Sequence, residues 1–286
     1  LTWATGNKET LTANQVTISS NLKEIEITNL SQTGNATLTA TCKRSKLKSK
    51  TKTIDRCKVF TIVNSKLSGA GIGTTTFDDG LTFSDVYGRR VQDDEIALPF
   101  PEAYRVLGVF ESNDNADADL PTVTVSSQTT TFTNNVVIGE QFIGADSGAV
   151  ARVVTISSGT KLEFVYENDR KFALNESFTL KTSGIVATIG NLTIGDRNIS
   201  DDFTLDDGQR EDYVDLARII RNPDALEPTR RLKIVYDVFN TDESSGTVES
   251  INSYDALDYS TEIPFVIDRR ASDYIDLRPR IKPMSL

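Results

Sequence analysis

The stretch of the chain best suited to binding chemistry is a run of cationic side chains near its amino-terminal end. Eight basic residues in this run are opposed by a single acid, Asp55; they are Lys43, Arg44, Lys46, Lys48, Lys50, Lys52, Arg56 and Lys58. Because strand side chains alternate with period two, the lysines at 46, 48, 50 and 52 would project from one face of an extended segment. Such a basic finger could dock on an acidic protein, a phosphate backbone or a charged glycan.

Two interpretations of this basic segment stay open. In the first it is a partner interface, and an acidic protein is favoured over nucleic acid because no aromatic residue stands among the lysines to stack on a base. The chain as a whole has 31 Lys and Arg against 41 Asp and Glu, a net charge of -10, which also argues against general nucleic-acid binding. In the second, the lysines are solvated and prevent edge-to-edge aggregation of a hairpin.

Few residues in the sequence have the types that catalysis uses. There is no histidine, which removes the commonest general base and the usual zinc ligand. Residues 113–119 place acidic or amide side chains at every second position, but they lack the glycine and the final glutamate of a helix-loop-helix calcium site. We interpret this stretch as a polar surface loop. We expect no catalytic residues, no metal ligands and no cofactor, and predict that the protein is not an enzyme.

The two cysteines, Cys42 and Cys57, lie at the ends of the basic stretch. They could face each other at the base of a hairpin and form a disulfide, although spacing does not prove the pairing. We favour free, packed thiols, as expected for a protein assembled in a reducing cytoplasm.

A duplication is the element around which the rest of the chain is organised. The letters GEQF at 139–142 and SGA at 147–149 recur at one fixed offset as NESF at 175–178 and SGI at 183–185. Each copy reads as a short strand, a Ser-Gly turn and an alternating strand. Since half of such a unit leaves an apolar face open, we predict that the two copies close against each other in one small barrel or sandwich.

Most of the remaining sequence also has the alternating pattern of strands. Runs of this kind lie at 16–18, 24–27, 36–40, 58–63, 105–110, 161–166 and 231–239. Helix is scarce, and the best candidate is 212–221, which Pro223 would stop. We predict an all-β fold of several small β-sandwich or barrel-like modules in series, one of them containing the duplication. The predicted domains are 1–118, which holds the basic hairpin, 119–195, which is the duplicated module, and 196–286, which is β-rich.

Two further features concern the setting of the chain. No apolar run approaches the ~20 residues that a membrane helix requires, so we expect no membrane association. The only methionine is Met284, and we interpret the sequence as a piece of a longer polypeptide.

Several motifs resemble segments of a known group of proteins. They are FTLDDGQR at 203–210, YVDL at 213–216, PTRRLKI at 228–234 and YIDLRP at 274–279, with SGAGIGTT at 68–75, GRRVQD at 88–93 and GVFES at 108–112. Together with the repeat, they are similar to large virion structural proteins of contractile-tailed cyanobacterial and other marine phages. The similarity covers most of residues 25–281.

This resemblance implies a tail, baseplate or tail-fibre component without an enzymatic role, and it brings no catalytic residue to this sequence. We therefore expect a virion protein, assembled in the host cytoplasm, whose partners are its own copies in a homo-oligomer and other tail or baseplate proteins. One alternative is a tail adhesin module that binds host glycan, although Trp3 is the sole tryptophan available as a sugar platform. Another is a polysaccharide-cleaving enzyme, which would need two carboxylates roughly 5–10 Å apart across a cleft.

Overall fold

The computed structural model of the chain describes residues 1–20, 24–39, 47–65, 82–83, 90–100, 102–114, 116–206, 217–254, 265–266 and 274–275. Within these residues the fold is all-β, which confirms the predicted class. The helical segments there are three short 3-10 turns, η1 (Ala13–Gln15), η2 (Ser200–Asp202) and η3 (Ile251–Tyr254). The chain divides into two compact units, Leu1–Leu47 and Lys48–Leu286. The domain boundaries expected near 118 and 195 stay predictions.

The amino-terminal unit is built from two small antiparallel sheets. β1 (Thr2–Trp3) pairs with β4 (Ala36–Thr37), and β2 (Val16–Ile18) pairs with β3 (Ile25–Ile27). Trp3 is the one hydrophobic side chain classed as buried in the described part of this unit. Its indole N–H donates to Oε2 of Glu9 at 3.3 Å, so the polar end of the ring has the partner that a buried tryptophan requires.

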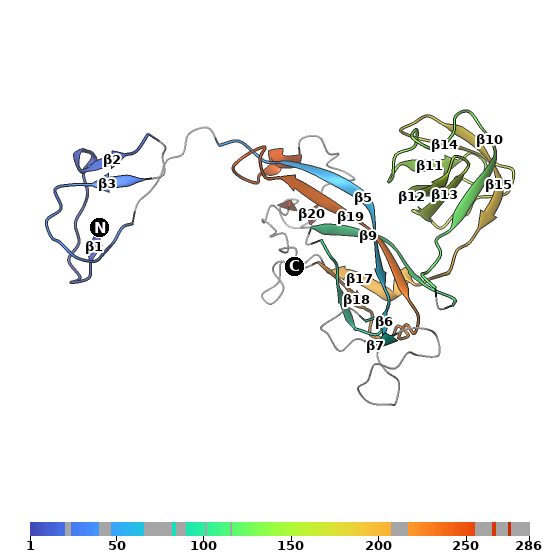
Figure 1. Cartoon of the computed structure of the whole chain (residues 1–286), viewed down its shortest axis with the longest axis horizontal. Coiled ribbons are helices and arrows are strands. Elements are labelled where there is room, and N and C mark those ends of the chain that lie inside the picture. Colours follow the sequence, from blue (N-terminus) through green and yellow to red (C-terminus); the bar gives the residue numbers. More distant parts are fainter. Residues whose placement is uncertain are drawn as a thin grey trace. The chain divides into compact units, whose positions relative to one another are not determined.

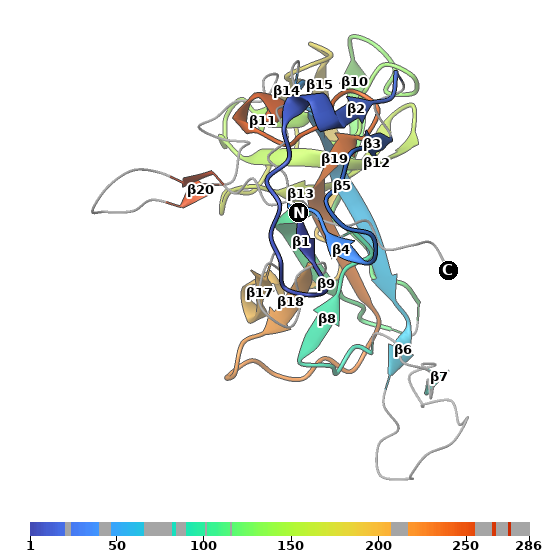
Figure 2. The same ribbon diagram turned by 90° about the vertical axis from the view of Figure 1, so that its left-hand side faces the viewer.

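In the second unit, two sheets share one hydrophobic core. The larger sheet has the order β16 (Arg197–Asn198), β9 (Ala103–Glu111), β19 (Leu232–Asp242) and β5 (Thr51–Ile62), and the long strands β5 and β19 run side by side in Figures 1 and 2. The smaller sheet has the order β17 (Phe203–Asp206), β18 (Arg218–Arg221) and β8 (Glu95–Ala97). Buried aliphatic residues of both sheets, such as Ile96, Ile219 and Ile234, pack in a single cluster.

Two short pairs of strands complete the second unit outside these sheets. β6 (Asn64–Ser65) pairs with β7 (Thr82–Phe83) in parallel, and β20 (Phe265–Val266) pairs with β21 (Tyr274–Ile275) in the antiparallel sense. The predicted strands at 105–110 and 231–239 correspond to β9 and β19 of the larger sheet, and the run at 58–63 is the second half of β5.

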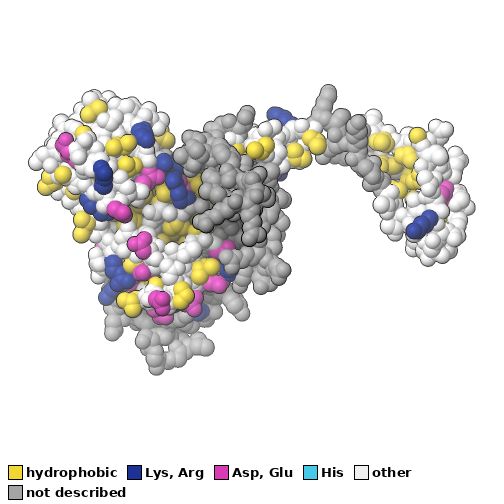
Figure 3. Space-filling model, turned by 180° about the vertical axis from the view of Figure 1, so that it is seen from behind, with side chains coloured by type: hydrophobic (Ala, Val, Ile, Leu, Met, Phe, Trp, Pro, Cys, Tyr) yellow, Lys and Arg dark blue, Asp and Glu magenta, His cyan; other side chains and the backbone are white. Residues whose placement is uncertain are grey.

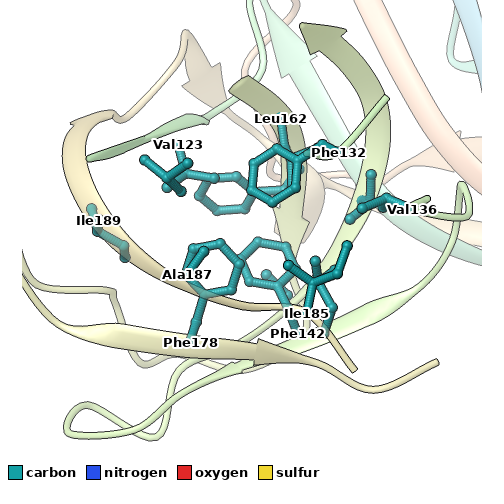
Figure 4. Packing of buried hydrophobic residues seen from close by; sticks show 14 of the residues in the cluster. Val123, Phe132, Val136, Phe142, Leu162, Phe178, Ile185, Ala187 and Ile189 are labelled. Carbon is teal, nitrogen blue, oxygen red and sulfur yellow. The ribbon is translucent and has the colours of Figure 1, made fainter. Parts of the chain in front are cut away.

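Between β9 and β16 the chain forms a closed six-stranded barrel, which confirms that the duplicated module closes on itself. Its strands are β10 (Thr122–Gln128), β13 (Lys161–Tyr166), β12 (Val150–Ser158), β11 (Gln141–Gly144), β14 (Ser177–Leu180) and β15 (Val186–Thr193), in that order around the barrel. Figure 4 shows the apolar side chains that fill the interior. The repeat-equivalent rings of Phe142 and Phe178 lie 5.0 Å apart, so the two copies meet at the centre of the core.

The two copies of the repeat pair directly with each other in this barrel. β11 and β12 lie in the first copy and pair with each other, as β14 and β15 do in the second copy. The copies meet where β11 pairs with β14. β10 and β13 lie outside the duplicated letters; they pair with each other, and with β15 and β12 respectively, and so close the barrel.

One sequence-based expectation is wrong in part. The segment 212–221 was the best helix candidate, but Arg218–Arg221 forms the strand β18, while residues 212–216 lie outside the described residues. Ile219 and Ile220 are β-branched, which favours strand over helix, and β18 has partners on both sides in β17 and β8. Tertiary pairing decides the conformation here.

Candidate functional site

The structure describes the carboxy-terminal half of the basic segment, from Lys48 to Lys58, whereas Lys43, Arg44, Lys46 and Cys42 lie outside the described residues. Four basic side chains of this half form ion pairs with carboxylates of their own chain. Lys50 pairs with Glu243, Lys52 with Glu102 and Glu249, Arg56 with Asp237, and Lys58 with Asp55. The backbone carbonyl of Lys48 accepts hydrogen bonds from the N–H groups of Thr247 and Val248. This half of the segment is thus built into the second unit.

Lys52 occupies an enclosed charged site. Its side chain is only 4% exposed, and Nζ lies 3.2 Å from Oε1 of Glu102 and 2.9 Å from Oε2 of Glu249. Nζ also lies 5.3 Å from the centre of the Tyr254 ring. Burial by itself would lower the pKa of Lys52, but Glu102, Tyr254 and Glu249 outweigh it and raise the pKa above the ordinary value. The amine therefore stays protonated and neutralises the carboxylates of Glu102 and Glu249.

A second charged network joins the barrel to the larger sheet. Asp237 on β19 is fully buried, and its Oδ2 accepts from Arg105 on β9 at 2.6 Å. Arg105 also lies 3.6 Å from Glu167 of the barrel, which pairs with Arg152 of β12 at 2.5 Å. Burial would raise the pKa of Glu167, yet hydrogen bonds from Gln141 and Arg152 bring it below its usual value. These charges form a continuous bridge from the sheet to the barrel.

The chain makes a bulge where β5 passes this network. Lys58 pairs with Tyr236 and Asp55 with Val238, so Arg56 and Cys57 together stand opposite Asp237. Cys57 has a φ of 54°, and its N–H donates to Oδ1 of Asp237 at 2.8 Å. Its thiol is free and buried, and burial raises its pKa to about 12, so it is unreactive at neutral pH.

An apolar cluster lies beside the charged bridge. It contains Cys57 and Val235 from the larger sheet, Val154 and Val165 from the barrel, and Leu120 from the connection between them. Leu120 lies in the segment that enters the barrel, and Asp196, in the segment that leaves it, donates its N–H to the carbonyl of Asp119 at 2.8 Å. Both connections between the barrel and the sheet are therefore held together at one point.

Two hollows lie on the described part of the second unit. One, of about 170 Å³, lies beside the barrel and is lined mainly by apolar and aromatic side chains, with Lys171 stacked 3.9 Å from the centre of the Tyr166 ring. Another, of about 330 Å³, contains Asp119, Glu163 and Asp196, but the carboxylate of Asp196 accepts from Asn113 and from the N–H of Asp119. The Asp196 carboxylate thus anchors the turn between Asn113 and Asp119.

Two further observations bear on binding chemistry. Trp3, the sole tryptophan, is 5% exposed and so offers no face to a glycan. Among the residues that the structure describes, no three His, Cys, Asp or Glu side chains gather as a metal site would need. Nor does the described part of the chain contain a helix that is long and apolar enough to cross a membrane.

Comparisons with protein-family models, with curated proteins and with solved structures found no match to this chain.

Sequence reasoning located the duplication and the basic segment but missed the buried networks. Glu140 and Glu176 are repeat-equivalent, and a glutamate at the same place in both copies was the available signal. The partners of Asp237 and Lys52 come from strands far apart in the chain, and no local spacing indicates them.

Proposed function

We propose that this chain is a structural component of a tailed-phage virion, in the tail or baseplate region, and that it acts by assembly through protein–protein interfaces. The motif resemblance over most of residues 25–281 supplies the virion context. The observation that carries the structural role is that the buried carboxylates of the second unit are engaged in joining its modules.

Three sets of buried carboxylates connect parts of the second unit. Glu140 and Glu176 tie the two repeats together, Asp237 and Glu167 bridge the larger sheet and the barrel, and Glu102 holds Lys52 beneath Tyr254. Removing one partner of such a buried pair leaves an uncompensated charge, so the pairs enforce one arrangement of the modules. A fixed arrangement suits a part that must present its surfaces to neighbours in a particle.

The direction of the pKa shift at Glu167 also favours a structural role for the buried charges. A carboxyl group that acts as a general acid needs a raised pKa, whereas the pKa of Glu167, the carboxylate nearest the centre of the bridge, is lowered. The protein thus uses this group as a permanent anion, and we assign it no reaction.

The basic segment is the interface that we propose for an acidic neighbour. Because Lys50 and Lys52 already pair with carboxylates of their own chain, we propose the contact for the other cations of the segment. These are Lys48 and the sequence positions Lys43, Arg44 and Lys46, which lie outside the described residues. The net charge of -10 makes another copy of this chain, or a similarly acidic tail protein, a complementary surface.

Mass spectrometry of density-purified particles tests the proposal. Particles from the host culture that expresses this chain should contain its peptides at a constant ratio to the other virion proteins across the gradient. Peptides that stay in the soluble lysate and never band with particles would overturn the virion assignment.

A further inference from the structure

We propose that the loop between β18 and β19 of one copy of this chain docks into the hollow beside the barrel of another copy. The loop carries the exposed side chain of Leu226, and the hollow carries the cation of Lys171. The inference rests on the proposed assembly role, and it names two surfaces through which the second units of neighbouring copies contact each other.

The hollow lies where the barrel meets the larger sheet. Phe110 of β9 lines it together with Val165, Phe172 and Leu192 of the barrel. Its volume is about 170 Å³, below the ~300–1,000 Å³ of pockets that take drug-sized ligands. An apolar cavity of about 150 Å³ accommodates a benzene molecule, so this hollow suits a single apolar side chain.

A cation and an exposed apolar side chain mark the mouth of the hollow. Ile194, which lines it, is 90% exposed. Lys171 also lines it, and Nζ lies 3.9 Å from the centre of the Tyr166 ring. Among the residues that the structure describes, Lys171 has no ion pair. An unpaired cation beside an apolar hollow favours an apolar side chain that brings a carboxylate with it.

The loop between β18 and β19 has this combination. Leu226 is 75% exposed, and Asp224 and Glu227 are exposed on either side of it in the sequence. Glu227 lies 4.0 Å from Arg221, whereas Asp224 has no ion pair within the described residues. Leu226 does not line the hollow of its own copy. The loop therefore presents the apolar and acidic groups that the hollow lacks.

Hydrogen bonds and two prolines restrain the loop. The N–H of Ala225 donates to the carbonyl of Asn222 at 3.0 Å, and the N–H of Asn222 donates to the carbonyl of Asp202 at 2.8 Å. Pro223 and Pro228 fix the backbone φ near its two ends. Because little of the loop remains to be ordered on binding, the entropic cost of the contact is small.

A second copy is the partner that these surfaces specify, because both halves of the contact are present on one chain. The loop and the hollow are different surfaces, so the contact is head-to-tail, and such contacts join copies into rings or filaments. In Figure 3, hydrophobic side chains lie among acidic and basic ones on the surface of the second unit. Small apolar contacts bordered by charge suit a surface of this kind.

Two charge-reversed variants of the full chain test the contact. One is Lys171→Glu at the hollow, and the other combines Asp224→Lys with Glu227→Lys in the loop. Each variant alone brings like charges together, so the dissociation constant of its self-association should rise ~10-fold or more. An equimolar mixture of the two brings opposite charges together and should recover most of the lost affinity. Sedimentation velocity in ~0.15 M salt, where screening over ~8 Å leaves only close charges to act, measures the association.

Leu226→Ser tests the apolar half of the contact. It should also raise the dissociation constant by ~10-fold or more, because the leucine is no longer buried in the hollow. The matched control is Ile251→Ser, at a 56% exposed position outside both the loop and the hollow, which should leave the dissociation constant unchanged. Circular dichroism and thermal unfolding check that all the variants fold.

Two results would overturn the inference. One is a wild-type chain that stays monomeric at every concentration measured. The other is an association that the loop and hollow variants leave unchanged, or that the mixture of charge-reversed variants fails to restore. Either result leaves the virion proposal intact if particles contain the chain. A chain that associates as expected but is absent from particles would sink the virion proposal and not the contact.

Discussion

Glu140 of the first repeat holds the turn of the second repeat at Ser183. Its Oε1 accepts the N–H of Thr182 at 2.6 Å and also the N–H of Ser183. The relationship is reciprocal, because Glu176 of the second repeat accepts the N–H of Ser147 at 3.0 Å and its hydroxyl at 2.8 Å. Both carboxylates are buried, so the hydrogen bonds are charge-assisted and shielded from water.

Glu140→Gln should therefore destabilise the barrel by about 1.5–3 kcal/mol, the usual worth of a hydrogen bond to a charged group. The amide retains one acceptor oxygen but loses the charge and brings an N–H group into a site that already has two donors. Denaturant unfolding of the full chain measures the loss. Asp146→Asn, at an exposed position of the equivalent turn of the first repeat, is the matched control and should have little effect. A Glu140→Gln variant as stable as the wild type would mean that the turn contact contributes nothing.

The contact between the barrel and β5 predicts the outcome at Gly139. Its φ is 82°, and a Cβ atom there would lie 2.3 Å from Cβ of Arg56. Gly139→Ala should therefore combine backbone strain with a clash that has no flexible end to yield, for a total of about 2–4 kcal/mol. Gly184→Ala is the control, because its φ is 69° but nothing lies within 4 Å of the new atom. It should cost only the strain, about 1 kcal/mol. A Gly139→Ala variant no less stable than Gly184→Ala would place the barrel away from β5.

The buried thiol of Cys57 predicts a loss of stability in alkali. Burial raises its pKa from an ordinary value near 9.0 to about 12 in the folded chain. Above pH ~9 the unfolded chain releases this proton while the folded chain keeps it, so the free energy of unfolding falls as pH rises through that window.

The expected contribution is a loss of about 1.4 kcal/mol by pH ~10. Cys57→Ala lacks the group, so the stability difference between wild type and variant should shrink by this amount between pH ~8 and pH ~10. Tyr104 and Tyr166 also have raised pKa values, mainly through burial, but they are present in both proteins and cancel in the difference. A difference that does not change with pH would show that the thiol is not protected in the folded state.

Lys50 and Lys52 are neighbours in the basic segment with different expected roles. Lys52→Ala would leave Glu102 and Glu249 buried without their cation, at a cost of about 3 kcal/mol or more. Lys50 pairs with Glu243, whose side chain is 66% exposed and can be solvated when the lysine is lost, so Lys50→Ala should be far milder. Thermal unfolding compares the two. If Lys52→Ala lowers the melting temperature no more than Lys50→Ala does, water must reach the carboxylates of Glu102 and Glu249 when the lysine is lost. Substitutions that test the basic segment as an interface should in either case leave Lys52 in place.

Local alternation predicted much of this fold, including β9, β13, β19 and the closure of the repeat into one barrel. The closure of the barrel by β10 was not predictable, since the strand runs found in the sequence do not include 122–128 and no local pattern indicates its pairing with β13 and β15. The same limit applies to Lys52: alternation placed it on one face of a strand with its neighbours, but only the packing of Tyr254 and Glu102 makes its own position an interior one. The helix expected at 212–221 failed at Arg218–Arg221 because pairing on both sides outweighed local pattern.

Electron microscopy of labelled particles tests the central claim most directly. A gold-conjugated antibody raised against the whole chain should mark the tail end or baseplate of intact virions, or of virions opened by mild disruption if the surfaces are buried by neighbours. Label confined to soluble lysate, with intact and disrupted particles both unmarked, would contradict the claim that this chain is part of the virion.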